Sequence, residues 1–320
     1  MTSSFITRFA PSPTGLLHLG HAYSAILAHD AARAAGGHFV LRMEDIDATR
    51  CKPIFEEAIY EDLDWLGLSW DGPVWRQSER FDDYQSVIER WAKERLVYRC
   101  FKTRKEVAEA IARAPHDLES TVLHEKCDRQ DRQHHRDHQY GNQSAGQDDG
   151  VGRTPPQAYY GTPLSPSEEA AAISGNEPFA WRLSLSACEA YLGQAFHALS
   201  FPAETGDKIS NERARPQLFG DAIIGRKEGG VSYHLASVYD DWHQGITHVI
   251  RGQDLADAAH LHTLLQKLMG APTPIYRHHK LINGADGKRL AKRNKAATLK
   301  ALRDIGISPE EVRARVGLIR

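Results

Sequence analysis

The pattern of hydrophobic positions at the start of the chain predicts a strand, a loop, a helix and a second strand. Residues 5–9 (FITRF) are typical of a short strand, and residues 10–20 contain the prolines and glycines of a loop. The alanine-rich segment 21–35 favours a helix that ends at a Gly-Gly pair, and residues 38–43 (HFVLRM) favour a second strand. Elements in this order form a βαβ unit, so a parallel sheet is expected.

Hydrophobic periodicity also predicts elements further along the chain. Apolar residues follow helical spacing after Pro53 and again over 79–95, and residues 179–185 (FAWRLSL) favour a strand. Residues 223–241 have the form of a hairpin that turns at Glu-Gly-Gly and whose second arm ends in an acidic pair. A strand over 245–252, a helix over 253–269 and a last short helix with a capping box at Ser308 are predicted after it.

One segment, residues 115–157, differs in composition from the rest of the chain. It is poor in aliphatic residues and rich in Asp, Gln, His, Arg and Gly. Such a segment buries too little apolar surface to offset the entropy lost on ordering, so a mobile insertion is expected. Its histidines suggest a metal site, but none of them has the usual spacing of zinc ligands.

Composition and charge narrow the class of protein. The chain has 320 residues, of which 41% are hydrophobic and 26% charged, as in globular proteins. It has neither an apolar run of about 18 residues nor a signal-peptide pattern, so we expect no membrane span and a cytoplasmic location. A net charge of −2 means that any nucleic acid must bind a local basic face, such as residues 288–300. The four scattered cysteines form no disulfide framework.

The segment 8–21, RFAPSPTGLLHLGH, carries the clearest chemical pattern. It leaves the first strand and enters the helix near His18 and His21, where free N–H groups and the positive end of the helix dipole suit a polyphosphate. Gly20 lacks a Cβ, so a nucleotide can approach the backbone, and the two imidazoles can donate hydrogen bonds to phosphate oxygens. An isolated HxGH is more often an ordinary turn with incidental histidines, but this pattern is much longer.

This segment resembles the HIGH signature of class I aminoacyl-tRNA synthetases and, over its whole length, the glutamyl branch of that family. RMEDIDATR at 42–50 and GITHVIRGQDL at 245–255 resemble two further blocks of the same branch. The resemblance covers most of the chain except the insertion. It implies a Rossmann-like α/β catalytic domain that activates glutamate with ATP, whose phosphates carry the Mg²⁺.

The resemblance also implies a set of residues for each substrate. The glutamate pocket would contain Arg8, Phe9, Ala10, Pro11, Ser12, Glu44, Tyr233 and Arg251. ATP would contact Pro11, His18, Gly20, His21, Arg289 and Lys292, with His18, His21 and Lys292 as the catalytic residues. Each pocket residue has a structural alternative when taken singly: a surface or core side chain, a helix cap, or one half of an ion pair. Together, and in this chain order, they favour a binding site.

The second class I signature, KMSKS, is altered in this chain. GADGKRLAKRN at 284–294 stands at the expected place, and Lys292 matches the second lysine. Arg289 replaces the first lysine and Ala291 replaces the serine. Arginine keeps the positive charge needed as pyrophosphate leaves, although with a different geometry, whereas the lost hydroxyl affects fine positioning.

Two departures from the glutamyl branch bear on the partner and on zinc. The sequence ends 28 residues after Lys292, which leaves no room for an anticodon-binding region. In this it resembles a truncated group of the branch that places glutamate on the queuosine base in the anticodon of tRNA(Asp). Many members of that group carry CxC and YxxxC zinc ligands, of which only Cys100 and Tyr159 remain here, so no structural zinc is expected.

The expected architecture is a Rossmann-like parallel-sheet domain interrupted by an inserted module. Its parts are a first half at 1–99, the module at 100–185, a second half at 186–280, and the KMSKS-like loop with a short helical piece at 281–320. The site is expected at the carboxyl ends of the strands, in a monomer whose partners are glutamate and queuosine-containing tRNA(Asp). Three alternatives stay open: a truncated enzyme that charges tRNA(Glu), a catalytically weak paralogue that binds RNA as a regulatory module, and another HxGH nucleotidyltransferase.

Overall fold

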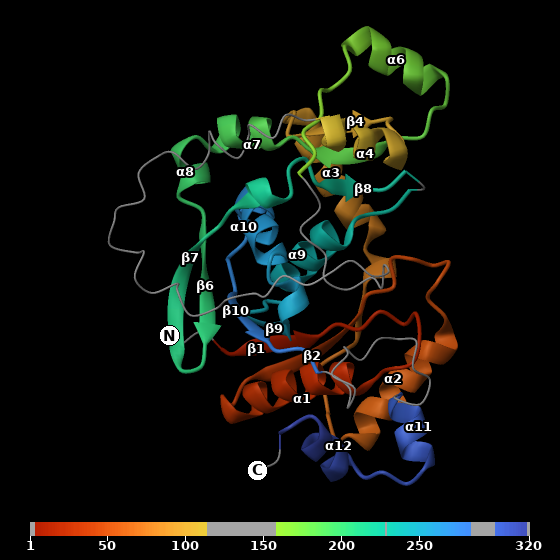
Figure 1. The fold of residues 1–320 in the computed structure, drawn as a ribbon, viewed down its shortest axis with the longest axis vertical. Helices are drawn as coiled ribbons and strands as arrows, with labels where there is room; N and C mark the ends of the chain where they lie inside the picture. The colour runs from red at the N-terminus through yellow and green to blue at the C-terminus, as the bar shows by residue number, and fades with distance from the viewer. Residues whose placement is uncertain (1–3, 114–157, 228, 283–297, 319–320) are drawn as a thin grey trace.

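A parallel sheet lies at the centre of the computed structural model, which describes residues 4–113, 158–227, 229–282 and 298–318 (Figure 1). Strands β1 (Ile6–Phe9), β2 (His38–Met43) and β3 (Trp75–Arg76) pair in parallel. Parallel strands β9 (His248–Gly252), β10 (Ile275–His279) and β6 (Ser200–Thr205) follow, and β7 (Lys208–Arg213) pairs antiparallel at the edge. The Thr247 amide donates to the Ile6 carbonyl over 2.9 Å, which places β9 beside β1.

Both faces of this sheet are buried, which explains why its strands are almost continuously apolar. In β2, the side chains of Phe39, Leu41 and Met43 pack into one core while Val40 packs against the other. The first core is covered by α1 (Leu19–Ala34), α2 (Pro53–Trp65), α11 (Leu299–Asp304) and α12 (Pro309–Arg315). The second is covered by α3 (Phe81–Lys93), α9 (Tyr233–His243) and α10 (Ala258–Met269), on the opposite side from α1 in Figure 1.

A second, antiparallel sheet lies beyond α3, at the top of Figure 1. It contains β4 (Val97–Cys100), β5 (Ala180–Leu183) and β8 (Ile223–Gly225). Helices α4 (Arg104–Arg113), α6 (Pro166–Ser174), α7 (Leu185–Leu192) and α8 (Gln194–His197), and 3₁₀ turns at Gln77–Glu79, Pro216–Leu218 and Gln253–Leu255, complete the described elements. The predicted mobile insertion at 115–157 falls outside the described residues. Among the helices that the structure describes, none is long and apolar enough to cross a bilayer.

The hairpin predicted for residues 223–241 is wrong in its second arm. The first arm is β8, but the chain makes only an isolated bridge between Gly225 and Val231 before it enters helix α9. The Ser232 hydroxyl caps that helix by accepting from the Leu235 amide over 3.3 Å. The serine cap and the helical spacing of apolar residues after it outweigh the strand preference of the aromatic and β-branched residues.

Candidate active site

A cavity of about 520 Å³ opens at the carboxyl ends of β1, β9 and β10. The connections from β1 and from β9 leave on opposite faces of the sheet, and in open α/β sheets the ligand site lies at such a switch point. Every predicted site residue that the structure describes lines this one cavity: Arg8, Phe9, Ala10, Pro11, Ser12, His18, Gly20, His21, Glu44, Tyr233 and Arg251. The remaining two, Arg289 and Lys292, fall outside the described residues.

The HLGH segment forms the first turn of α1. The His18 Nδ1 atom accepts from the Gly20 amide over 3.0 Å, and the His21 Nδ1 atom accepts from the His18 amide over 3.2 Å. A neutral imidazole that accepts at Nδ1 carries its proton on Nε2, so capping fixes the tautomer in which Nε2–H is the donor. A Cβ on residue 20 would lie 2.9 Å from the His18 ring, so this arrangement requires glycine.

The segment that contains Arg289 and Lys292 is flanked on both sides by described residues that lie at the cavity or beside His18. Ile282, the last described residue before it, lines the cavity. Thr298, the first described residue after it, forms an antiparallel bridge with His18. The Leu299 amide then donates to the Leu17 carbonyl over 2.8 Å. The described residues on both sides of this segment therefore lie at the same cavity as the helix turn that carries the two histidines.

Arg251 is a buried cation, only 5% exposed, and is one of the residues that line the cavity. Its Nε donates to His278 Nε2 over 3.3 Å, and its guanidinium lies 5.2 Å from the Tyr276 ring centroid. Burial and the nearby Arg251 charge lower the pKa of His278 to about 3, so His278 is neutral and can accept this bond. Among the described residues, neither Nη atom of Arg251 has a hydrogen-bond partner. Such donors favour an anionic ligand.

Arg8 faces the same cavity from β1 and is also 5% exposed. Its Nε donates to Asp241 Oδ1 over 2.9 Å. Glu44 also lines the cavity, and its amide donates to the Pro11 carbonyl over 3.0 Å. Burial raises the pKa of Glu44 to about 7, although Arg42 and Arg8 oppose the shift. The cavity thus combines two fixed cations with one carboxylate that ionises near neutral pH.

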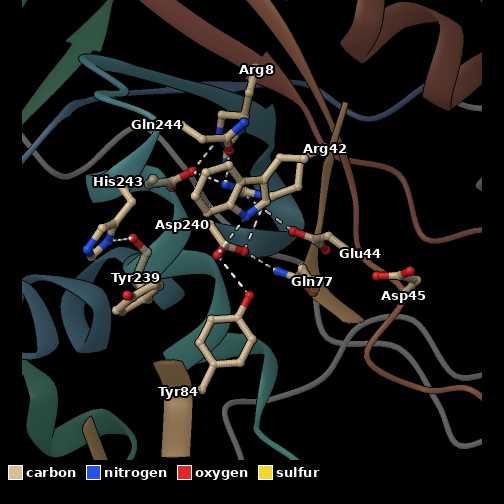
Figure 2. Close-up of polar contacts among 12 residues, drawn as sticks. Arg8, Arg42, Glu44, Asp45, Gln77, Tyr84, Tyr239, Asp240, His243 and Gln244 are labelled. Atoms are coloured by element: carbon tan, nitrogen blue, oxygen red, sulfur yellow. Dashed lines mark hydrogen bonds and ion pairs between the residues drawn. The ribbon is translucent and has the colours of Figure 1, made fainter. Parts of the chain in front are cut away.

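Sequence reasoning missed a network of buried charges behind these residues (Figure 2). Arg42 has no exposed side-chain surface, and its Nη1 atom donates to Asp241 over 2.8 Å. Asp240, equally buried, accepts from Trp75, Gln77 and Tyr84 over 3.0, 2.7 and 2.8 Å. The signal for this network was the acidic pair itself, which was assigned to the end of a strand rather than to the inward face of α9.

The two remnants of the zinc motif, Cys100 and Tyr159, lie close together. Cys100 and Tyr159 are both buried, and burial together with the neighbouring Cys100 thiol raises the pKa of the Tyr159 hydroxyl. The nearby Asp221 carboxylate already accepts from the Tyr98 hydroxyl and from the Gly161 and Leu185 amides over 2.8 to 2.9 Å. No group of three potential metal ligands occurs among the described residues.

The fold and cavity define a class of protein. A parallel α/β sheet with a polyphosphate-suited HLGH turn and a doubly cationic pocket at its switch point is the arrangement of a class I synthetase catalytic domain. The family model "tRNA synthetases class I (E and Q), catalytic domain" matches residues 4–151 and 204–319. The chain belongs to this family.

Curated relatives and solved structures agree with this assignment. The chain is 41% identical over 317 residues to a protein of Rhodobacter capsulatus called glutamyl-Q tRNA(Asp) synthetase. The alignment covers 98% of this chain and 100% of the relative. A protein of the same name from Symbiobacterium thermophilum is 37% identical over 316 residues, covering 95% of this chain and 83% of the relative. A glutamate tRNA ligase from Elizabethkingia meningosepticum superposes with a TM-score of 0.61 at 27% identity. That alignment covers 91% of this chain and 52% of the ligase, so the chain spans about half its length.

Proposed function

We propose that this protein activates glutamate with ATP to form glutamyl-adenylate, and transfers the glutamyl group to the queuosine base in the anticodon of tRNA(Asp). The observation that carries the proposal is Arg251, a buried residue of the cavity lining whose two Nη atoms have no hydrogen-bond partner among the described residues. Desolvating such donors is costly unless a ligand satisfies them, and a carboxylate matches their fork geometry. The names of the relatives support glutamate as the ligand that carries this carboxylate.

The charges in the cavity match the charges of glutamate. Its α-carboxylate must reach the α-phosphate of ATP, which leaves the γ-carboxylate for Arg8 and Arg251. Its α-ammonium then pairs with Glu44, a carboxylate in the lining of the same cavity. The γ-carboxylate and the α-ammonium of the amino acid thereby each have a partner of opposite sign.

The reaction follows from the positions of the donors. A glutamate α-carboxylate oxygen attacks the α-phosphorus of ATP in line, and pyrophosphate leaves with the bonding electron pair. The Nε2–H groups of His18 and His21, at the N-terminus of α1, stabilise the charge that grows on the phosphates. Arg289 and Lys292 would neutralise the leaving pyrophosphate, and Mg²⁺ arrives with ATP. A queuosine hydroxyl then attacks the acyl carbon and AMP leaves.

The choice of tRNA acceptor is tested with labelled glutamate and ATP. Purified protein is incubated with queuosine-containing tRNA(Asp), with tRNA(Asp) that lacks queuosine, and with tRNA(Glu). We expect label only on the first. Label on tRNA(Glu) alone would identify a truncated charging enzyme and overturn the acceptor assignment. Absence of both RNA labelling and glutamate-dependent pyrophosphate exchange would identify a non-catalytic paralogue.

Glutamate affinity should increase as the pH rises through about 7. The Glu44 carboxylate, whose pKa is raised to about 7, must be ionised to pair with the substrate ammonium. One pH unit below that pKa, roughly a tenth of the sites are ionised, so the KM for glutamate should be about tenfold higher than its limit at alkaline pH. The measurement is pyrophosphate exchange across this range. Glu44→Gln should bind weakly at every pH, and a flat profile in the unsubstituted protein would contradict the role of Glu44.

A further inference from the structure

Asp241 joins two arginines that come from different strands. Its Oδ1 atom accepts from Arg8 Nε over 2.9 Å and from Arg42 Nη1 over 2.8 Å. Arg8 lies on β1 and Arg42 on β2, whereas Asp241 reaches them from α9. Asp241 is 5% exposed and is absent from the cavity lining, so it acts on a ligand only through other residues.

The bond from Arg8 to Asp241 uses Nε and leaves both Nη atoms of the guanidinium available to a ligand. A guanidinium presents two flat edges, and a carboxylate that takes Nε leaves the outer Nη edge for a second partner. Arg251 is held in the same way, because its Nε donates to His278. The two arginines of the cavity are therefore each fixed through Nε by a protein acceptor, one on α9 and one on β10.

Arg42 holds Asp241 in turn and connects it to Glu44, another residue of the cavity lining. Its Nη1 atom also donates to Gln244 over 3.0 Å, and its Nη2 atom lies 3.5 Å from a Glu44 carboxylate oxygen (Figure 2). Burial alone raises the pKa of Asp241, but attraction to Arg8 and Arg42 lowers it below its ordinary value, so Asp241 is ionised. The Asp241 carboxylate thus links Arg8 to Arg42, and Arg42 in turn contacts Glu44.

We propose that Asp241 is a positioning residue, which sets the guanidinium of Arg8 so that its Nη edge meets the γ-carboxylate of glutamate. This inference rests on the proposed function, because it concerns the same substrate. Loss of the Asp241 carboxylate frees Arg8 to rotate about its side-chain torsions, and a small displacement of a positioning group strongly weakens recognition. The effect should appear in glutamate binding and in discrimination against glutamine, which lacks the γ-carboxylate charge.

The test compares Asp241→Asn with Asp62→Asn in pyrophosphate exchange. Asp62 is a matched control because it is also a fully buried aspartate beside an arginine, Arg303 at 3.4 Å, but lies on α2 away from the cavity. For Asp241→Asn we expect the KM for glutamate to rise at least about tenfold and the preference for glutamate over glutamine to fall by a similar factor. The KM for ATP should change less than about twofold. Asp62→Asn should alter neither the KM for glutamate, nor the preference for glutamate over glutamine, nor the KM for ATP.

Two further variants separate positioning from general damage. In an Arg8→Gln background, Asp241→Asn should raise the KM for glutamate by less than about twofold, since its target is gone. If Asp241→Asn does not fold, Asp241→Glu keeps the buried charge and moves the acceptor by one methylene, and it should still raise the KM about tenfold. A normal KM in Asp241→Glu, or full additivity with Arg8→Gln, would overturn the inference. Failure of the proposed function is recognised separately, because the unsubstituted protein would then show no glutamate-dependent exchange.

Discussion

Replacement of Arg251 by glutamine is expected to lower kcat/KM for glutamate in pyrophosphate exchange about 10³-fold while the fold loses little stability. Each hydrogen bond between a charged donor and a carboxylate contributes about 1.5–3 kcal/mol. Two such bonds from the Nη atoms amount to roughly 4 kcal/mol, and every 1.4 kcal/mol is a factor of about ten. The expected loss follows from these two bonds alone.

The small effect on stability has a separate cause. In the protein without substrate, Arg251 is buried and its Nη atoms lack partners among the described residues, so its desolvation is not offset. Glutamine removes that unpaired charge but also removes the Nε bond to His278 and the contact with the Tyr276 ring. These changes oppose one another, so the free energy of unfolding should change by less than about 1 kcal/mol.

The matched control for this experiment is Arg277→Gln. Arg277 lies on β10 next to His278 and pairs with Glu204, outside the cavity. The Arg277→Gln variant should leave the KM for glutamate unchanged. Urea denaturation and pyrophosphate exchange, measured on both variants, separate recognition from stability. A loss below about tenfold in Arg251→Gln, or a loss that matches its destabilisation, would contradict a ligand-binding role for Arg251.

Local sequence patterns predicted the half of the sheet around β1 and β2 because the strands and helix starts there are determined by residues close together in the sequence. The apolar run HFVLRM became β2 over its full length, since both sheet faces are covered. The Pro-bearing helix start at Pro53 and the capping box at Ser308 were also confirmed, because caps act within four residues and need no tertiary context.

Elements whose structure depends on distant partners could not be predicted in the same way. The hairpin of β6 and β7 was missed, and every residue of β7 is exposed, so no alternation of buried and exposed positions marks it. Helix α9 was taken for a strand because its buried acids, Asp240 and Asp241, looked like a polar strand end. Burial of those acids is stabilised by arginines and polar donors that come from β1, β2, β3, the 3₁₀ turn at Gln77–Glu79 and α3.

The resemblance named residues that the structure brings to one cavity, whereas it did not name the residues that support them. The eleven described residues expected at the site line one cavity, although they come from segments more than 200 residues apart. Asp241 and Arg42 carry no motif that reports their contacts, because their roles arise from pairing across the chain. The contacts of Arg289 and Lys292 stay a prediction, since both lie outside the described residues.

Replacement of Arg42 by methionine should destabilise the protein by about 3–5 kcal/mol, because it breaks a buried ion network from one side. Arg42 has no exposed side-chain surface and faces Asp240, Asp241 and Glu44. Methionine fills much of the volume, so the loss comes from carboxylates left without their cation rather than from a void. The measurement is urea denaturation at neutral pH. Arg33→Met, which removes a half-exposed pair with Asp71, is the matched control and should cost less than about 1 kcal/mol.

The pH dependence of this loss identifies its cause. Burial already raises the pKa of Asp240 with Arg42 in place. Without Arg42, the folded-state pKa of Asp240 should rise further and that of Asp241 should rise above its unfolded value, so the folded variant binds more protons than its unfolded chain. Stability of the variant then falls as the pH rises through the range between the two values. In the unsubstituted protein the pKa of Asp241 is lowered, so its contribution is instead lost as the pH falls. The difference in unfolding free energy between the two proteins should therefore be smaller near pH 5 than near pH 7.5, whereas a packing defect would give the same difference at both.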